Sequence, residues 1–295
     1  MAAQRPMAGV LAGPNGAGKS SAAPHLLRGA LHVDAFVNAD VIAQGLSAFD
    51  PDAVAAEAGH ILLRRLGELI DQRATFAWET TLSGNTARHL FQRLNDAGYA
   101  IHLIYLWLPS AEMAIERVRR RVELGGHDIP EPTIRRRFAR SLVNFQTVYR
   151  PISSDWRVYY NPEPDVSHLI AVGTGDSVSE IVDTDRWRMF SEQSTEFGKV
   201  REPHSVYAGE AMKRPTDAEH AGTRGEEEFD REAVFKDGFE IDRAITRAHG
   251  DVIRLHRAFG VPLVIWRDGR VQSVDPNEVP IPDPDAVQRV LNSRP

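Results

Sequence analysis

The chain of 295 residues contains no cysteine, which excludes disulfides, thiolate zinc sites and a cysteine nucleophile. No apolar stretch approaches the ~18 residues of a membrane-spanning helix, and the short polar start at Met1–Met7 lacks the form of a signal peptide. Positive charge is not in excess either, since the formal net charge is −6. We therefore predict a cytoplasmic protein with no membrane partner and no general affinity for nucleic acid.

Strand-like and helix-like segments alternate through the first 190 residues. Short apolar runs indicate strands at 7–12, 31–37, 75–78, 101–108, 156–160 and 168–172. Apolar residues at helical spacing indicate helices at 52–71, 86–97, 111–124 and 134–149. This alternation predicts an α/β fold of the P-loop NTPase, kinase-like class, in which helices flank a parallel sheet.

Residues 1–190 form the predicted kinase-like domain, and the composition of the sequence changes after it. Residues 191–228 lack hydrophobic periodicity and are rich in Glu, Gly, Ser, Thr and Pro, so we interpret them as a linker without regular structure. Order resumes in 229–295, where a helix ending near Phe259 precedes two apolar runs separated by Arg-Asp-Gly-Arg. These features predict a small α+β module made of a helix and a β-hairpin.

A phosphate-binding loop follows the first strand. It matches G-x-x-x-x-G-K-[ST], the Walker A pattern, at every required position. The candidate nucleotide-binding residues are Gly13, Pro14, Asn15, Gly16, Ala17, Gly18, Lys19, Ser20 and Ser21. Lys19 is expected to reach the β- and γ-phosphates, and Ser20 to ligate Mg²⁺. The alternative is a chance glycine-rich turn, but the strand before the loop and the helix after it favour nucleotide binding.

Two carboxylates follow the second and third predicted strands, at the sheet edge where ligands of α/β proteins bind. Asp40 is suited to accept the proton of an acceptor hydroxyl, as the base of a phosphotransferase. Glu79, followed by Thr80 and Thr81, could hold the metal and the acceptor hydroxyls. The alternative for either carboxylate is that it caps the next helix.

Arginines are concentrated between residues 117 and 140, where eight of them stand against three acidic residues. Two basic helices hinged at Gly125-Gly126 would form a lid that neutralises the transferring phosphoryl group. We assign this role to Arg121 and Arg137, and expect His127 in the hinge loop to touch substrate. For Arg119, Arg136 and Arg140 we favour the alternative of a solvated helix face.

Taken in order, these motifs resemble the zeta-toxin family of P-loop kinases over about residues 7–190. The matching segments after the P-loop are Asn38-Ala39-Asp40, Trp78–Gly84, Arg117–Pro130 and Ile134–Phe138. The resemblance implies an ATP-dependent kinase that uses Mg²⁺, with ATP in preference to GTP. It implies phosphorylation of a hydroxyl on UDP-N-acetylglucosamine or a similar anionic small molecule.

The resemblance also implies roles for single residues. Asp40 matches the catalytic base, Lys19 and Ser20 the nucleotide and metal positions, Glu79 an acidic substrate-site residue, and Arg121 and Arg137 the lid arginines. Two other functions stay open. One is a metabolite kinase without a toxic role, and the other is a nucleotide-binding switch that acts through its C-terminal module.

The C-terminal module resembles small proteins encoded beside such kinases. Residues 217–242 contain ten acidic side chains against three basic ones. Our hypothesis is that residues 213–295 act as an antitoxin in cis, with the acidic stretch lying against the basic lid or the nucleotide site. The alternative is a solvated linker followed by an accessory domain.

Overall fold

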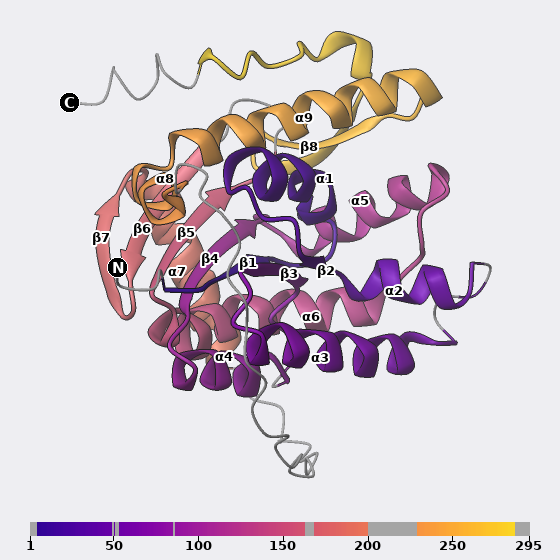
Figure 1. The fold of residues 1–295 in the computed structure, drawn as a ribbon. Helices are drawn as coiled ribbons and strands as arrows, with labels where there is room; N and C mark the ends of the chain where they lie inside the picture. Colours follow the sequence, from indigo (N-terminus) through magenta and orange to yellow (C-terminus); the bar gives the residue numbers. More distant parts are fainter. Residues whose placement is uncertain are drawn as a thin grey trace.

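The computed structural model describes residues 5–48, 50, 53–84, 86–162, 168–199 and 229–286. A seven-stranded sheet has the order β2-β3-β1-β4-β5-β6-β7 (Figure 1). Its strands are β1 (Met7–Ala12), β2 (Phe36–Val37), β3 (Phe76–Thr80), β4 (Ala100–Trp107), β5 (Asp155–Tyr160), β6 (His168–Thr174) and β7 (Ser177–Ile181). The first five run parallel, and β6 and β7 are antiparallel. The predicted P-loop kinase-like fold class is confirmed.

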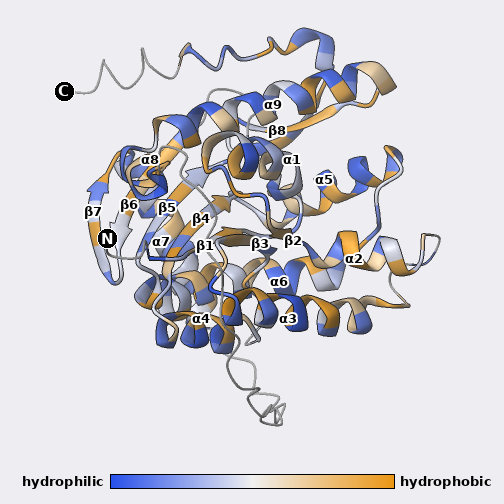
Figure 2. Cartoon of the chain, viewed as in Figure 1, coloured by the Kyte–Doolittle hydropathy of each residue, from blue (hydrophilic) through white to orange (hydrophobic). Residues whose placement is uncertain are grey.

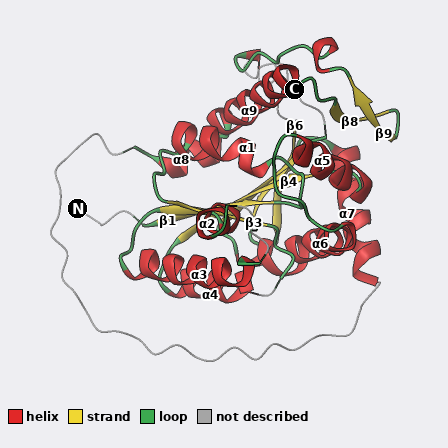
Figure 3. Ribbon diagram, turned by 90° about the vertical axis from the view of Figure 1, so that its right-hand side faces the viewer, coloured by secondary structure: helices red, strands yellow, loops and turns green. Residues whose placement is uncertain are grey.

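Helices cover both faces of the sheet (Figure 3). One face carries α1 (Lys19–Ala23) with its π-helical continuation (Pro24–Ala30), α8 (Arg231–Asp237) and α9 (Phe239–Phe259). The other carries α3 (Ala55–Asp71), α4 (Thr86–Asp96), α6 (Glu131–Asn144) and α7 (Thr184–Lys199). The remaining helices are α2 (Ala39–Leu46), α5 (Ala111–Glu123), a π-helical turn (Phe145–Tyr149) and two 3-10 turns (Arg150–Ile152 and Pro276–Glu278). Among the described residues, no helix is long and apolar enough to cross a membrane.

The centre of the sheet fixes the positions of the site loops. All eight residues of β4 are buried, because this strand lies between β1 and β5 and is covered by helices on both faces. The one basic side chain in β4, His102, pairs with Asp155 at 2.8 Å. In Figure 2, hydrophilic residues lie along the outer sides of α3 and α4, whereas β8 (Leu263–Arg267) is largely hydrophobic.

The predicted linker is wrong over its first residues. Residues 191–199 belong to α7, whose Phe190 is fully buried against the rings of Tyr105 and Trp107. Only Phe190 and Ser194 are buried in this helix, so its polar exposed faces conceal the periodicity. The edge strand β7 was also missed, because all five of its residues are exposed. The rest of the predicted linker, 200–228, lies outside the described residues.

The predicted C-terminal helix and hairpin form as α9 and as β8 paired with β9 (Arg270–Val274). The hairpin turns at Asp268 and Gly269, both with positive φ. Phe235, Ile241 and Ile245 join the same hydrophobic core as the central strands. Residues 229–286 therefore complete one face of the seven-stranded sheet.

Two polar side chains of β5 attach this segment to the sheet. The buried Arg157 guanidinium donates to the carbonyls of Phe235 and Lys236 at 2.7 Å. The Tyr159 hydroxyl donates to Asp242 Oδ1, also at 2.7 Å. Burial, with Asp242 beside the hydroxyl, raises the pKa of Tyr159 well above its usual value. Without α8 and α9, these polar groups of β5 would lose their hydrogen-bond partners.

Candidate active site

The phosphate-binding loop joins β1 to α1, and its glycines are required by close approaches. Gly13 has φ 142° and faces the carbonyl oxygen of Leu106 so closely that no Cβ fits. Gly18 has φ 86°, and a Cβ there would lie 2.8 Å from Asn161 Nδ2. Both positions need a residue that tolerates positive φ and lacks a side chain, as the sequence pattern requires.

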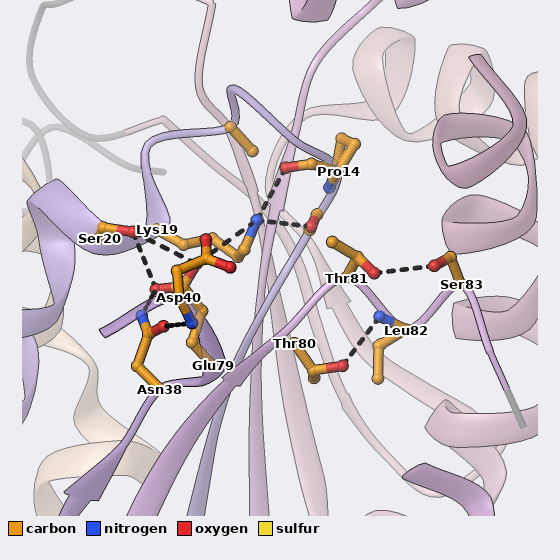
Figure 4. Close-up of polar contacts among 12 residues, drawn as sticks. Pro14, Lys19, Ser20, Asn38, Asp40, Glu79, Thr80, Thr81, Leu82 and Ser83 are labelled. Carbon is orange, nitrogen blue, oxygen red and sulfur yellow. Dashed lines mark hydrogen bonds and ion pairs between the residues drawn. The ribbon is translucent and has the colours of Figure 1, made fainter. Parts of the chain in front are cut away.

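Lys19 lies at the centre of the loop and is buried. Its Nζ donates to the carbonyl oxygens of Gly13 and Pro14, each at 2.8 Å, and lies 3.8 Å from Glu79 Oε1 (Figure 4). Burial lowers the pKa of Lys19, and the opposite charges of Glu79 and Asp40 counteract part of that effect. A buried ammonium with carbonyl and carboxylate partners is suited to exchange them for phosphate oxygens.

Glu79 is the second buried charge of the site. Its Oε2 accepts from Ser20 Oγ at 3.0 Å and from Asn38 Nδ2 at 2.8 Å. Burial raises the pKa of Glu79, while Lys19 and the Ser20 hydroxyl lower it. The carboxylate and the hydroxyl thus converge from β3 and α1, as predicted for the metal position.

Asn38 was missed as a site residue, and it connects the two predicted carboxylates. Its Oδ1 accepts from the backbone N–H of Asp40 at 2.8 Å, so Asn38 is the N-cap of α2. The Asp40 carboxylate is exposed at the first turn of α2, and in Figure 4 it points toward Lys19 and Ser20. Because Asn38 caps the helix, the Asp40 side chain is left to face the cleft.

The lid arginines approach from α5 and α6. Arg121 and Arg137 both line the cleft, and their charges act on Lys19. Arg121 Nη2 donates to the backbone carbonyl of His127 at 2.6 Å, which holds the arginine against the hinge loop. The His127 side chain is not among the residues lining the cleft. Arg119 forms surface ion pairs with its neighbours, as the solvated-face alternative expects.

One cleft of about 650 Å³ contains most of these groups. Thr80, Thr81 and Leu63 of α3 also line it. The Thr81 and Ser83 hydroxyls are 2.8 Å apart (Figure 4). Of the predicted site residues, the cleft lining omits Gly13, Pro14, Ala17 and His127. It includes all the others: Asn15, Gly16, Gly18, Lys19, Ser20, Ser21, Asp40, Glu79, Thr80, Thr81, Arg121 and Arg137.

Arg117 and Asn161 were also missed, although both contact the P-loop. Arg117 donates to the carbonyls of Asn161 and Pro162 at 2.8 Å, and to Gly16 at 3.4 Å. Burial lowers the pKa of Arg117 to about 10. Asn161 Nδ2 donates to the Ala17 carbonyl at 2.6 Å. The position of Asn161 directly after β5, at the ligand-binding edge of the sheet, is a signal that could have identified it.

The donor atoms suit a small hard cation. No group of three or more metal-ligating His, Asp or Glu side chains occurs within the described ranges. The Ser20 hydroxyl and the Glu79 carboxylate nevertheless place oxygen donors 3.0 Å apart beside Lys19. Mg²⁺ takes few protein ligands and completes its shell with water and nucleotide phosphates, so this sparse oxygen set fits it.

Comparison with known proteins identifies the family. The family model described as Zeta toxin matches residues 1–170, more than half of the chain. The chain belongs to the zeta-toxin family. An uncharacterized protein of Haemophilus influenzae is 30% identical to it over 129 residues, which are 43% of this chain and 88% of that protein.

Solved structures share the fold. The complex of AvrRxo1-ORF1 with AvrRxo1-ORF2, determined with sulphate ions and also with ATP, superposes with a TM-score of 0.52 at 18% identity. The match covers 64% of this chain and 64% of that one, so the chain spans less than two thirds of those relatives. The PezAT toxin-antitoxin system of Streptococcus pneumoniae matches at 13% identity with a TM-score of 0.45, covering 68% of this chain and 90% of that one.

Proposed function

We propose that this chain is an ATP-dependent kinase that phosphorylates a hydroxyl of a UDP-N-acetyl sugar or a similar anionic small molecule. The observation that carries the proposal is the convergence of Lys19, Glu79 and Asp40 in one cleft, with Arg121 and Arg137 acting on the same charges. A nucleotide-binding switch needs the P-loop, but it requires neither a carboxylate at Asp40 that accepts a proton nor the two arginines.

The roles follow from the positions. Lys19 exchanges its carbonyl partners for the β- and γ-phosphate oxygens. Ser20 and Glu79 would hold Mg²⁺, which would supply positive charge to offset that of the phosphates. Asp40 accepts the proton of the acceptor hydroxyl while the hydroxyl oxygen forms a bond to the γ-phosphorus of ATP. The bond from the γ-phosphorus to the oxygen of the β-phosphate breaks, and ADP is the leaving group. Arg121 and Arg137 stabilise the negative charge on the transferring group.

The cleft lining contains groups that suit a ring-bearing acceptor. Thr80 and Thr81 offer hydroxyls, and Leu63 and Leu90 add apolar surface. Two arginines favour an acceptor that is itself anionic. These features support a nucleotide sugar, and they are also compatible with a phosphorylated metabolite.

The experiment is to incubate the full-length protein with γ-labelled ATP, Mg²⁺ and a panel of UDP-sugars and anionic metabolites, and to identify labelled products by mass. A labelled UDP-N-acetyl sugar is the expected result. A labelled metabolite of another class would retain the kinase and reject the acceptor. ATP binding without transfer to any compound would favour the nucleotide-binding switch.

A toxic role and its restraint by residues 213–295 stay predictions. Two of the described acidic residues of this segment are engaged elsewhere: Asp242 with Tyr159, and Glu240 with Arg243 at 3.0 Å. The acidic residues of 217–228 lie outside the described ranges. Inducing the wild-type chain and the Asp40→Asn variant in bacteria separates the two predictions. Growth arrest that needs the intact base would show toxicity and contradict restraint by residues 213–295, whereas growth without arrest would contradict toxicity of the full-length chain.

A further inference from the structure

The cleft has a second end, beyond the P-loop and away from Asp40 and Glu79. It is lined by Ala248, His249 and Val252 of α9 and by Val264 of β8. These residues lie outside the part of the chain that matches the family model, residues 1–170. The surface is apolar apart from the imidazoles of His249 and His256, so it differs in chemistry from the charged acceptor end.

The geometry of phosphoryl transfer indicates which part of the substrates would lie at this end of the cleft. Donor and acceptor oxygens lie in line on opposite sides of the transferring phosphorus. In the proposed function Lys19 holds the phosphates at the edge of the sheet, between α9 on one face and α3 on the other, and Asp40 and Glu79 mark the acceptor side. The nucleoside of the donor must therefore extend the other way, past Ser21 toward α9 and β8.

We propose that α9 and β8 form the wall of the nucleoside subsite and pack against the base of the bound nucleoside triphosphate. The inference rests on the proposed kinase function and names residues for its donor side. An apolar surface formed by Ala248, Val252 and Val264 suits the flat face of a nucleobase. In this role the segment completes the site that the family domain leaves open.

The wall is fixed to the phosphate-binding loop by two connections. Asn161 Oδ1 accepts a hydrogen bond from His249 Nε2, while its Nδ2 donates to the Ala17 carbonyl. Arg117 donates to the carbonyl of Val264 at 3.3 Å as well as to Gly16. Phosphate loop and base wall are thus held in register, which orders the site before ATP binds.

Further contacts indicate that α9 is a permanent part of the site and not a segment that detaches from it. Asp251 of α9 pairs with His25, next to α1, at 2.7 Å. Ile245 and Ala248 are part of the core that includes the central strands. A restraint that must leave the site would have to break this core, whereas a wall of the site stays in place.

The test measures binding of ATP and of inorganic tripolyphosphate, which lacks a nucleoside, to full-length protein by calorimetry. Val252→Trp fills the proposed base position with a side chain that starts partly exposed. We expect the ATP dissociation constant to rise about tenfold or more, and that of tripolyphosphate to stay within about twofold. The matched control Leu46→Trp, an exposed aliphatic residue of α2 that does not line the cleft, should leave ATP affinity unchanged.

Leu255→Trp provides a second variant, because Leu255 lines the same end and is 47% exposed, so bulk there leaves the core intact. Unchanged ATP affinity in both folded tryptophan variants overturns the proposal. Tighter ATP binding or faster phosphotransfer also overturns it, and would assign the segment as a cover. If wild-type protein binds ATP through this wall but transfers phosphate to no acceptor, the kinase proposal fails while the base wall stands.

Discussion

Arg117→Met should separate the phosphate loop from the segments that surround it. The guanidinium donates to carbonyls of three stretches of chain: Gly16 of the P-loop, Asn161 and Pro162 after β5, and Val264 of β8. Methionine keeps the aliphatic volume and removes every donor. The variant therefore isolates the hydrogen bonds from the packing of the side chain.

The magnitude follows from the two bonds of 2.8 Å, since the other two are 3.3 and 3.4 Å long. Hydrogen bonds to a charged group each contribute about 1.5–3 kcal/mol. Removing the charge recovers part of this free energy, because burying the charged guanidinium is unfavourable, which also lowers the pKa of Arg117 to about 10. We expect the free energy of unfolding to fall by about 2–4 kcal/mol.

Urea denaturation followed by circular dichroism measures the stability, and calorimetry measures the ATP dissociation constant. The matched control is Arg119→Met on the same helix, where the side chain is 61% exposed and forms surface ion pairs. That variant should cost less than about 1 kcal/mol. If Arg117→Met is as stable as the wild type and binds ATP equally well, Arg117 does not join these segments.

Three further predictions follow. Gly59→Ala, in α3 with open space around the added Cβ, should raise the unfolding free energy by about 0.5–1 kcal/mol. Gly18→Ala should instead weaken ATP binding, because its Cβ would clash with Asn161. Equal ATP affinities of the two variants would contradict the conformational argument. Burial raises the pKa of Tyr99 and of Tyr149 to about 12. Because the unfolded chain ionises these tyrosines near pH 10, the unfolding free energy should not depend on them below pH 10 and should fall between about pH 10 and pH 12. A spectrophotometric titration in which every tyrosine of the folded protein ionises near pH 10 would refute this. Glu79→Gln, which removes the charge but keeps the shape, should raise the Mg²⁺ concentration needed for half-maximal phosphotransfer by about tenfold or more, and an unchanged requirement would exclude Glu79 from the metal position.

The sequence predicted the parts of the site that depend on local pattern. The P-loop needs glycines at fixed spacing, and Gly13 and Gly18 have the positive φ and close neighbours that explain them. Asp40 and Glu79 could be placed because each follows or ends a strand of a parallel sheet. Their shared partner Asn38 was within a recognised motif, but its hydrogen bond to Glu79 depends on where β3 lies relative to α2.

Contacts between distant segments could not be predicted in this way. His249 reaches Asn161 across 88 residues of sequence, and Arg117 reaches Val264 across 147. Neither contact follows from periodicity or turn chemistry, which are local. The predicted helix ending near Phe259 forms as α9, but the sequence did not show that it packs on the central sheet rather than within a separate module.

The central claim is that this cleft transfers phosphate with Asp40 as the base. The most direct measurement compares Asp40→Asn with the wild type in two assays: single-turnover transfer from ATP to the acceptor that the panel identifies, and the ATP dissociation constant. The exposed Asp96→Asn, at the end of α4, serves as the control. We predict a loss of transfer of about 10²–10⁴-fold with ATP affinity unchanged, since Asp40 takes a proton and does not hold phosphate. Full phosphotransfer by a folded Asp40→Asn protein would contradict the account.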